Sequence, residues 1–183
     1  MERRQAIKNA LILLGGSLLL PDVLKAWEFP RIENQSFVWT ESENELLVAL
    51  TEIIIPKTDT PGAREAGVAA FILKFVADCE AKEKQILFKT GLETVESRAK
   101  SQFNKSFLDC KPDEQIAIVK RMNAEATDGT RLKNDSFFYM LKHLTFVGYF
   151  TSEIGATQAL RYEAVPGRYD GNYPYKKGDK AFY

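Results

Sequence analysis

Residues 148–174 contain the combination of side chains that most resembles an active-site loop. The stretch places Ser152 beside Glu153 and adds two arginines, several tyrosines and several glycines. A serine nucleophile needs a base within hydrogen-bond reach, and a zinc or iron centre needs converging His, Cys or carboxylate ligands. The stretch contains neither His nor Cys. We therefore asked whether it is catalytic, binds a cofactor, or is shaped to fit another protein.

Ser152 lacks the strand–turn–helix elbow that exposes a serine nucleophile, and no neighbouring His serves it. Ser152 and Glu153 instead predict the start of a short helix through Ala159, with Thr151 as its cap. The acids Glu41 and Glu43 are typical of a helix start and are weak evidence for glycoside hydrolysis.

The rest of the chain adds no set of residues for a cofactor or a metal. His143 is the only histidine, and its position beside Leu144 predicts a helix-surface residue. Cys79 and Cys110, the only cysteines, are too few for an iron–sulfur cluster, and the sequence leaves a bridge between them open. Dinucleotide and phosphate-binding glycine motifs are absent. We therefore assign no catalytic, cofactor-binding or metal-ligating residue to this chain.

The chain has 183 residues, with Lys plus Arg equal to Asp plus Glu. This length fits one domain with a proper core. The charge balance excludes a bulk attraction to nucleic acid or to an anionic membrane surface.

The first 26 residues have the layout of an export signal. A basic head with Arg3 and Arg4 precedes an uncharged run of eleven residues, 10–20, which is short of the ~20 needed to span a bilayer. The paired arginines resemble a twin-arginine signal, which exports folded proteins; the alternative is a Sec signal whose head contains two arginines. We expect a periplasmic or envelope protein with a mature domain over residues 27–183.

Apolar spacing predicts an all-α domain of about five helices. The first begins at a capping box, Thr40 to Glu43, and ends before Pro56. The others cover about 68–80, about 82–102, Pro112 to Asp128, and a segment that begins near Asp135. An irregular tail rich in Tyr, Pro and Gly follows from roughly Ala164.

Each predicted helix has an expected inward face. The residues expected there are Leu46, Leu47, Leu50, Ile53 and Ile54; Val68, Phe71, Ile72, Phe75 and Cys79; Ile86, Leu92, Val95 and Ala99; Ile116, Val119 and Met122; and Phe137, Phe138, Leu141, Leu144 and Val147.

Two long blocks carry a family resemblance. These are LTEIIIPKTDTPGAREAGVAAFI at residues 50–72 and LTFVGYFTSEIGATQALRYEAVPGRYDGNYP at residues 144–174. Together they resemble the gluconate 2-dehydrogenase subunit 3 family, the small subunits of envelope flavin-dependent sugar and polyol dehydrogenases. The resemblance implies a partner: a large subunit of the glucose–methanol–choline type that carries FAD and the catalytic groups. It also implies a cytochrome or another electron acceptor, with haem or an iron–sulfur cluster elsewhere in the complex.

On this resemblance the chain is a non-catalytic subunit that helps the large subunit to mature and to be exported, and it meets the membrane only through the complex. Its sugar substrate would be chosen by the large subunit. The alternative is a free-standing periplasmic sugar-binding protein or enzyme, with Glu153, Arg161 and the tyrosines as a pocket.

We expect the Pro-Gly turn of the first block and the second block to form one partner surface, because Tyr and Arg are enriched at interfaces. The residues expected there are Asp59, Pro61, Gly62, Gly148, Tyr149, Phe150, Thr151, Ser152, Glu153, Gly155, Arg161, Tyr162 and Tyr169.

Overall fold

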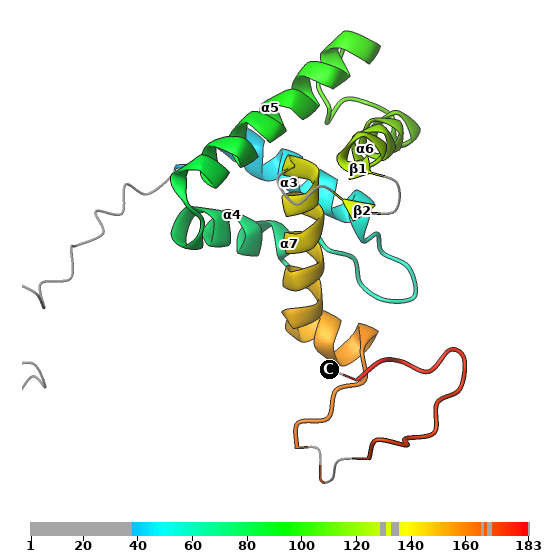
Figure 1. The fold of residues 1–183 in the computed structure, drawn as a ribbon. Coiled ribbons are helices and arrows are strands. Elements are labelled where there is room, and N and C mark those ends of the chain that lie inside the picture. Colours follow the sequence, from blue (N-terminus) through cyan, green and yellow to red (C-terminus); the bar gives the residue numbers. More distant parts are fainter. Residues whose placement is uncertain (1–37, 129–130, 133–135, 166, 168–169, 183) are drawn as a thin grey trace, which may run out of the picture. The chain divides into compact units, whose positions relative to one another are not determined.

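The computed structural model describes residues 38–128, 131–132, 136–165, 167 and 170–182, all within one compact unit over residues 36–183. The predicted all-α class is confirmed (Figure 1). The elements of this part are α3 (Glu41–Ile54), α4 (Val68–Cys79), α5 (Lys82–Phe103), α6 (Pro112–Ala126), β1 (Thr127–Asp128), β2 (Arg131–Leu132), α7 (Phe137–Thr151) and the π-helical turn η1 (Gly155–Ala159).

The predicted helix starts are confirmed by their hydrogen bonds. In the capping box of α3 the Thr40 hydroxyl accepts from the Glu43 amide at 3.2 Å, and the Glu43 carboxylate accepts from the Thr40 amide at 2.7 Å. Pro112 begins α6, and the carboxylate of Glu114 accepts from the Lys111 amide at 2.8 Å. These side chains satisfy amides that the first helical turn leaves without a partner.

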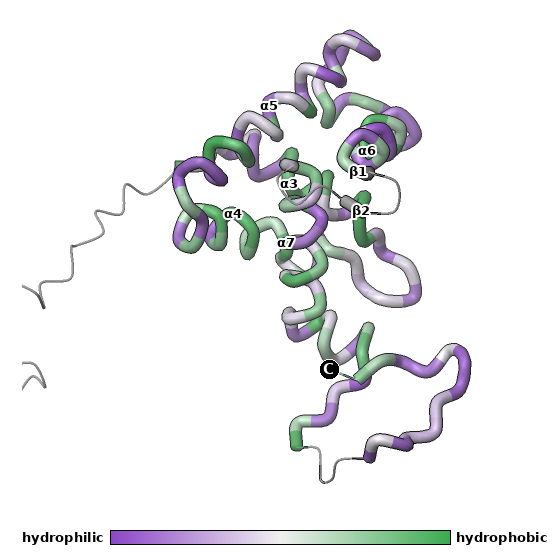
Figure 2. The backbone as a smooth tube through the Cα atoms, in the orientation of Figure 1, coloured by the Kyte–Doolittle hydropathy of each residue, from purple (hydrophilic) through white to green (hydrophobic). Residues whose placement is uncertain are grey.

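Helix α7 lies at the centre of the domain and packs against α3, α4, α5 and α6. Figure 2 shows hydrophobic residues concentrated in α4 and α7. Seven residues expected on the inward faces of α5 and α7 are buried: Leu92, Val95, Ala99, Phe137, Phe138, Leu141 and Leu144. The Phe137 ring meets that of Phe88 edge to face, with centroids 5.2 Å apart.

Two residues that we expected to face inward are exposed. Ile86 in α5 is 62% exposed and Ile116 in α6 is 37% exposed. Each stands two positions before the residue that starts the buried face, Phe88 in α5 and Ile118 in α6. Two positions rotate a side chain by about 200° around a helix, so both isoleucines point away from the core.

Cys79 was also expected to face inward, but it is exposed because it is the last residue of α4. Cys110 is buried, and both thiols are free. Burial raises the pKa of the Cys110 thiol, which keeps it protonated and unreactive.

The predicted end of the fourth helix at Asp128 is replaced by a short ladder. Helix α6 ends at Ala126, and β1 pairs antiparallel with β2 through Thr127 with Leu132 and Asp128 with Arg131. No strand was expected here, because two residues are too few to show an alternating pattern.

None of the helices in the described ranges is long and apolar enough to cross a membrane.

We predict that Gly91→Ala lowers the free energy of unfolding by about 1–3 kcal/mol, because overpacking outweighs the better helix propensity of alanine. A Cβ at Gly91 would lie 2.1 Å from the Phe137 ring. Chemical denaturation measures the change. The control is Thr90→Ala at the exposed neighbouring position, where a change within about 0.5 kcal/mol is expected. A Gly91→Ala protein more stable than wild type would contradict this packing.

Candidate functional site

The loop between α3 and α4 is held in shape by a carboxylate from α3. Glu52 accepts from the Lys57 amide at 3.0 Å and from the Arg64 amide at 2.8 Å. The Ala63 amide closes the neck of the loop by donating to the Ile55 carbonyl at 2.9 Å. The Pro-Gly turn of the first sequence block is therefore a fixed loop, because both of its ends are tied to α3.

Gly62 is required where the Glu52 carboxylate enters the loop. A Cβ at this position would lie 2.4 Å from a Glu52 carboxylate oxygen and 2.7 Å from the Lys57 amide nitrogen. Gly62 is buried, whereas Asp59 is exposed on the same loop. Glu52 was not expected here, since its distance from the loop amides along the chain forms no recognisable sequence pattern.

Tyr149 of α7 joins the two sequence blocks. Its hydroxyl donates to the Pro61 carbonyl at 2.7 Å and lies 3.5 Å from the Thr60 hydroxyl oxygen. The residue is only 2% exposed. The structure thus brings the loop and α7 together, and Tyr149 lies inside this contact and not on its surface.

Gly148 allows α7 to approach α4 closely. A Cβ here would lie 2.6 Å from the Phe71 ring and 3.3 Å from a methyl group of Val68. Gly148 therefore positions the part of α7 that carries Tyr149 and Phe150.

Ser152 builds the turn between α7 and η1. Its hydroxyl donates to the Tyr149 carbonyl at 2.6 Å and accepts from the Gly155 amide at 3.0 Å. A Cβ at Gly155 would lie 1.8 Å from the same Tyr149 carbonyl oxygen, so glycine is required. The hydroxyl of a serine has one hydrogen to donate, and here it is used in the turn.

Our expectation that Thr151 caps the short helix is wrong. Thr151 is the last residue of α7, and its hydroxyl donates back to the Val147 carbonyl at 2.6 Å. In the π-helical turn that follows, the amide of the first residue, Gly155, donates to the Ser152 hydroxyl at 3.0 Å.

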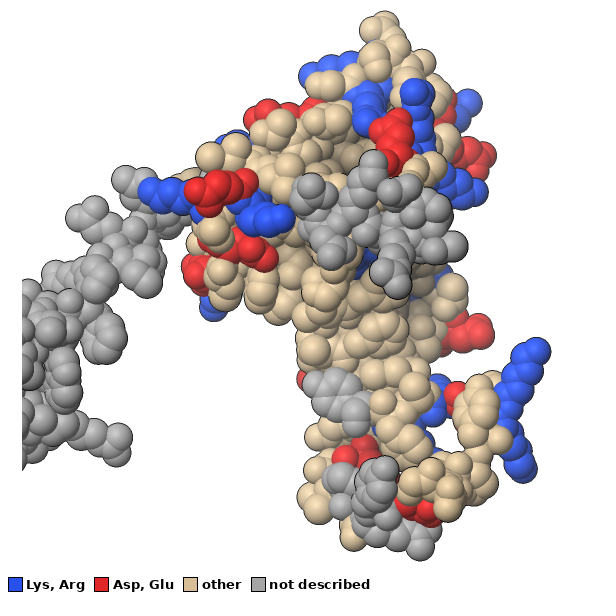
Figure 3. Space-filling model, in the orientation of Figure 1, with Lys and Arg blue, Asp and Glu red and all other residues tan. Residues whose placement is uncertain are grey.

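An aromatic stripe runs along α7, formed by Tyr139, His143, Phe146 and Phe150. Their spacing of four, three and four residues places them on one helix face. Tyr139 stacks on His143 with centroids 5.8 Å apart, and Phe146 stacks on Phe150 at 6.1 Å. Phe146 is 40% exposed, and Figure 3 shows few charged side chains over the C-terminal half of α7. This face has the composition of a protein interface, rich in aromatics and depleted of charge.

The remaining residues of the expected surface are exposed: Glu153, Arg161 and Tyr162. Tyr169, Arg3 and Arg4 lie outside the described residues, so the structure does not test them. The proposal that these side chains contact a partner stays a prediction.

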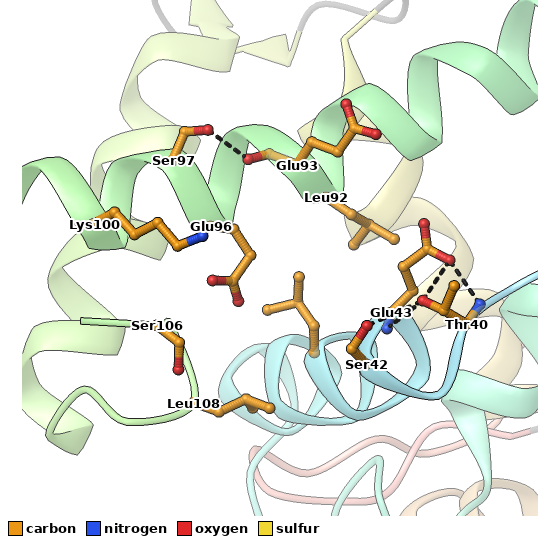
Figure 4. Close-up of a pocket in the computed structure, with 11 residues that line it drawn as sticks. Thr40, Ser42, Glu43, Leu92, Glu93, Glu96, Ser97, Lys100, Ser106 and Leu108 are labelled. Carbon is orange, nitrogen blue, oxygen red and sulfur yellow. Dashed lines mark hydrogen bonds between the residues drawn. The ribbon is translucent and has the colours of Figure 1, made fainter. Parts of the chain in front are cut away.

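A groove of about 590 Å³ lies between the start of α3, α5 and the segment before α6 (Figure 4). Two of its three acidic residues have structural tasks, because Glu43 caps α3 and Glu96 accepts from the Phe107 amide at 3.3 Å. Partial burial raises the pKa of Glu43, but hydrogen bonds from Thr40 and the charge of Lys89 hold it below the usual value. The sequence did not predict this groove, which combines three separate segments.

Within the described part of the chain, His, Cys, Asp and Glu side chains form no group of three that could hold a metal ion.

The fold and site thus define a helical protein whose two sequence blocks meet around one buried tyrosine. The profile of the gluconate 2-dehydrogenase subunit 3 family matches residues 41–167, which is more than half of the chain. The chain belongs to this family, as the two blocks indicated. No curated protein and no solved structure matches it. Family membership makes it a small subunit of a dehydrogenase complex with partner subunits.

We predict that Tyr149→Phe lowers the free energy of unfolding by about 1 kcal/mol, because the Pro61 carbonyl loses its partner while the ring still packs. Urea denaturation of the purified chain measures the loss. Tyr175→Phe is the matched control, since Tyr175 is 74% exposed, and it should leave stability unchanged. Equal stability of Tyr149→Phe and wild type would show that the hydroxyl does not hold the two blocks together.

Proposed function

We propose that this chain is the non-catalytic small subunit of an envelope dehydrogenase complex that oxidises CH–OH groups of sugars or glycosides. In this proposal its partner is a large FAD-containing subunit of the glucose–methanol–choline type, which passes electrons to a cytochrome or another acceptor. The chain itself assists the maturation of the large subunit and its export by the twin-arginine route.

One observation carries the proposal: polar side chains of the second sequence block form hydrogen bonds that hold the fold together. Ser152 ties η1 to the end of α7, and Tyr149 ties α7 to the Pro61 loop. A catalytic serine would keep its hydroxyl hydrogen for a base. The long block that resembles the family is therefore better explained by a defined surface than by a reaction.

The aromatic groups near this framework support a protein partner. The exposed Phe146 and the half-buried Phe150 form an aromatic face on α7, and the Pro61 loop contacts the same helix through Tyr149. Rigid aromatic area beside a fixed loop loses little conformational entropy on binding, which favours affinity.

The N-terminal residues support the export role. A signal for folded proteins is of use to a chain that travels with a flavoprotein, because FAD must be loaded before export. A basic head with Arg3 and Arg4 followed by a short apolar run is consistent with such a signal.

We predict that replacing both Arg3 and Arg4 with Lys retains the large subunit in the cytoplasm. The measurement is the distribution of FAD-linked dehydrogenase activity between periplasmic and cytoplasmic fractions of cells that express both subunits. Lys8→Arg is the control, because it keeps the arginine pair and the charge of the basic head. Unchanged export with both lysines in place would overturn the export role and favour a Sec signal.

A further inference from the structure

Arg161 closes the C-terminal segment into a loop. Its amide donates to the Ala181 carbonyl at 2.8 Å, and residues 161 and 182 form a parallel bridge. We call the described residues of this segment, 161–165, 167 and 170–182, the C-terminal arm. Near the same closure, the ammonium group of Lys180 donates to the Gln158 carbonyl. This hydrogen bond ties the end of the segment to η1. The arm therefore leaves the helical domain and returns to its own starting point.

The Arg161 side chain reinforces this closure. Its guanidinium donates to the Tyr173 hydroxyl at 2.6 Å and lies 4.6 Å from the centroid of the Phe182 ring. The Tyr173 and Phe182 rings meet edge to face at 5.2 Å. A planar guanidinium can hydrogen-bond and stack at the same time, which a lysine ammonium cannot do. Arg161 thus fixes three points of the arm: its start, its middle and its end.

The arm exposes more apolar surface than a solvated tail requires. Every described residue of the arm is exposed, and its large apolar side chains include Tyr162 at 52%, Val165 at 81% and Tyr175 at 74%. A flexible tail would lose conformational entropy when it bound a partner, whereas a loop closed by Arg161 has already lost much of it. This combination of closure and exposed apolar side chains is what a preformed binding element needs.

We propose that the C-terminal arm is the element that inserts into the FAD-containing large subunit, with Arg161 holding it in the binding conformation. This inference rests on the proposed function and names the contact that would make the complex. Val165 and Tyr175 would supply the apolar contacts. Lys176 and Lys177, which follow Tyr175 directly, would supply charged contacts beside them.

The charges of the arm fit a protein surface better than a lipid surface. The basic residues between 161 and 182 are interspersed with acids: the sequence has Arg161, Arg168, Lys176, Lys177 and Lys180 together with Glu163, Asp170 and Asp179. The carboxylate of Asp179 accepts from the Lys176 amide at 2.8 Å. An anionic membrane attracts uninterrupted basic clusters, and acids among the lysines oppose such attraction. A protein rim can match both signs, which supports the large subunit as the occupant.

The closure is tested first in the full chain without its partner. Arg161→Ala should increase hydrogen exchange of the amides at residues 171–182 several-fold while the exchange of α7 stays as in wild type. Arg161→Lys should also increase it, because lysine cannot hydrogen-bond Tyr173 and stack on Phe182 together. Unchanged exchange in both variants would overturn the role of Arg161.

The docking is tested with the full chain co-expressed with the FAD-containing large subunit of its complex. Val165→Ser, Tyr175→Ala and Arg161→Ala should each reduce the flavin-bearing subunit retained on the tagged chain by about tenfold, as expected for central interface residues. The matched control is Ile86→Ser, since Ile86 is 62% exposed on α5, and it should retain the large subunit like wild type.

The outcomes separate this inference from the proposed function. If wild type retains the flavoprotein and the three arm variants retain it equally well, the arm is not the docking element although the subunit role stands. If wild type retains no flavoprotein, the proposed function and the arm both fail. If the arm variants abolish only a homodimer of this chain, the arm pairs copies and the inference is overturned.

Discussion

The hydrogen bond from the Tyr149 hydroxyl to the Pro61 carbonyl is the contact on which the site depends. It spans 88 positions of the sequence at 2.7 Å, and its donor, Tyr149, is an almost fully buried residue. On one side it meets a loop that Glu52 holds closed, and on the other it lies at the end of α7, beside the turn built by Ser152. A change in any of these three parts would shift the others, because the tyrosine ring has little room to move in a packed core.

This constraint explains two of the four glycines in the second block. Gly148 lets α7 lie against Phe71 of α4, and Gly155 lets η1 lie against the Tyr149 carbonyl. Both are close approaches of helical backbone, and neither needs a positive φ. Gly148 and Gly155, which made this block resemble a cofactor loop, therefore allow the helices to pack closely. The aromatic stripe of α7 and the C-terminal arm then project from a framework whose geometry is fixed.

Much of the fold could be predicted from local signals. The Thr40 capping box, the Pro112 helix start and the apolar spacing of α7 each have a short-range physical cause, and each appears in the structure. Ile86 and Ile116 were misplaced because each begins a run of apolar residues that covers more than one helix face, and only the neighbouring helices decide which face is buried. The site was harder, since Glu52, Tyr149 and the closure by Arg161 depend on contacts between distant segments. Their residue types were visible in the sequence, but their partners were not.

The central claim is that this chain is a subunit whose folded surface binds a flavoprotein partner. Size-exclusion chromatography of the co-expressed pair, with flavin absorbance and protein identity followed across the profile, tests it most directly. We predict one species that contains this chain, the large subunit and bound FAD. Elution of this chain as a lone monomer, separate from a fully FAD-loaded and active large subunit, would contradict the account.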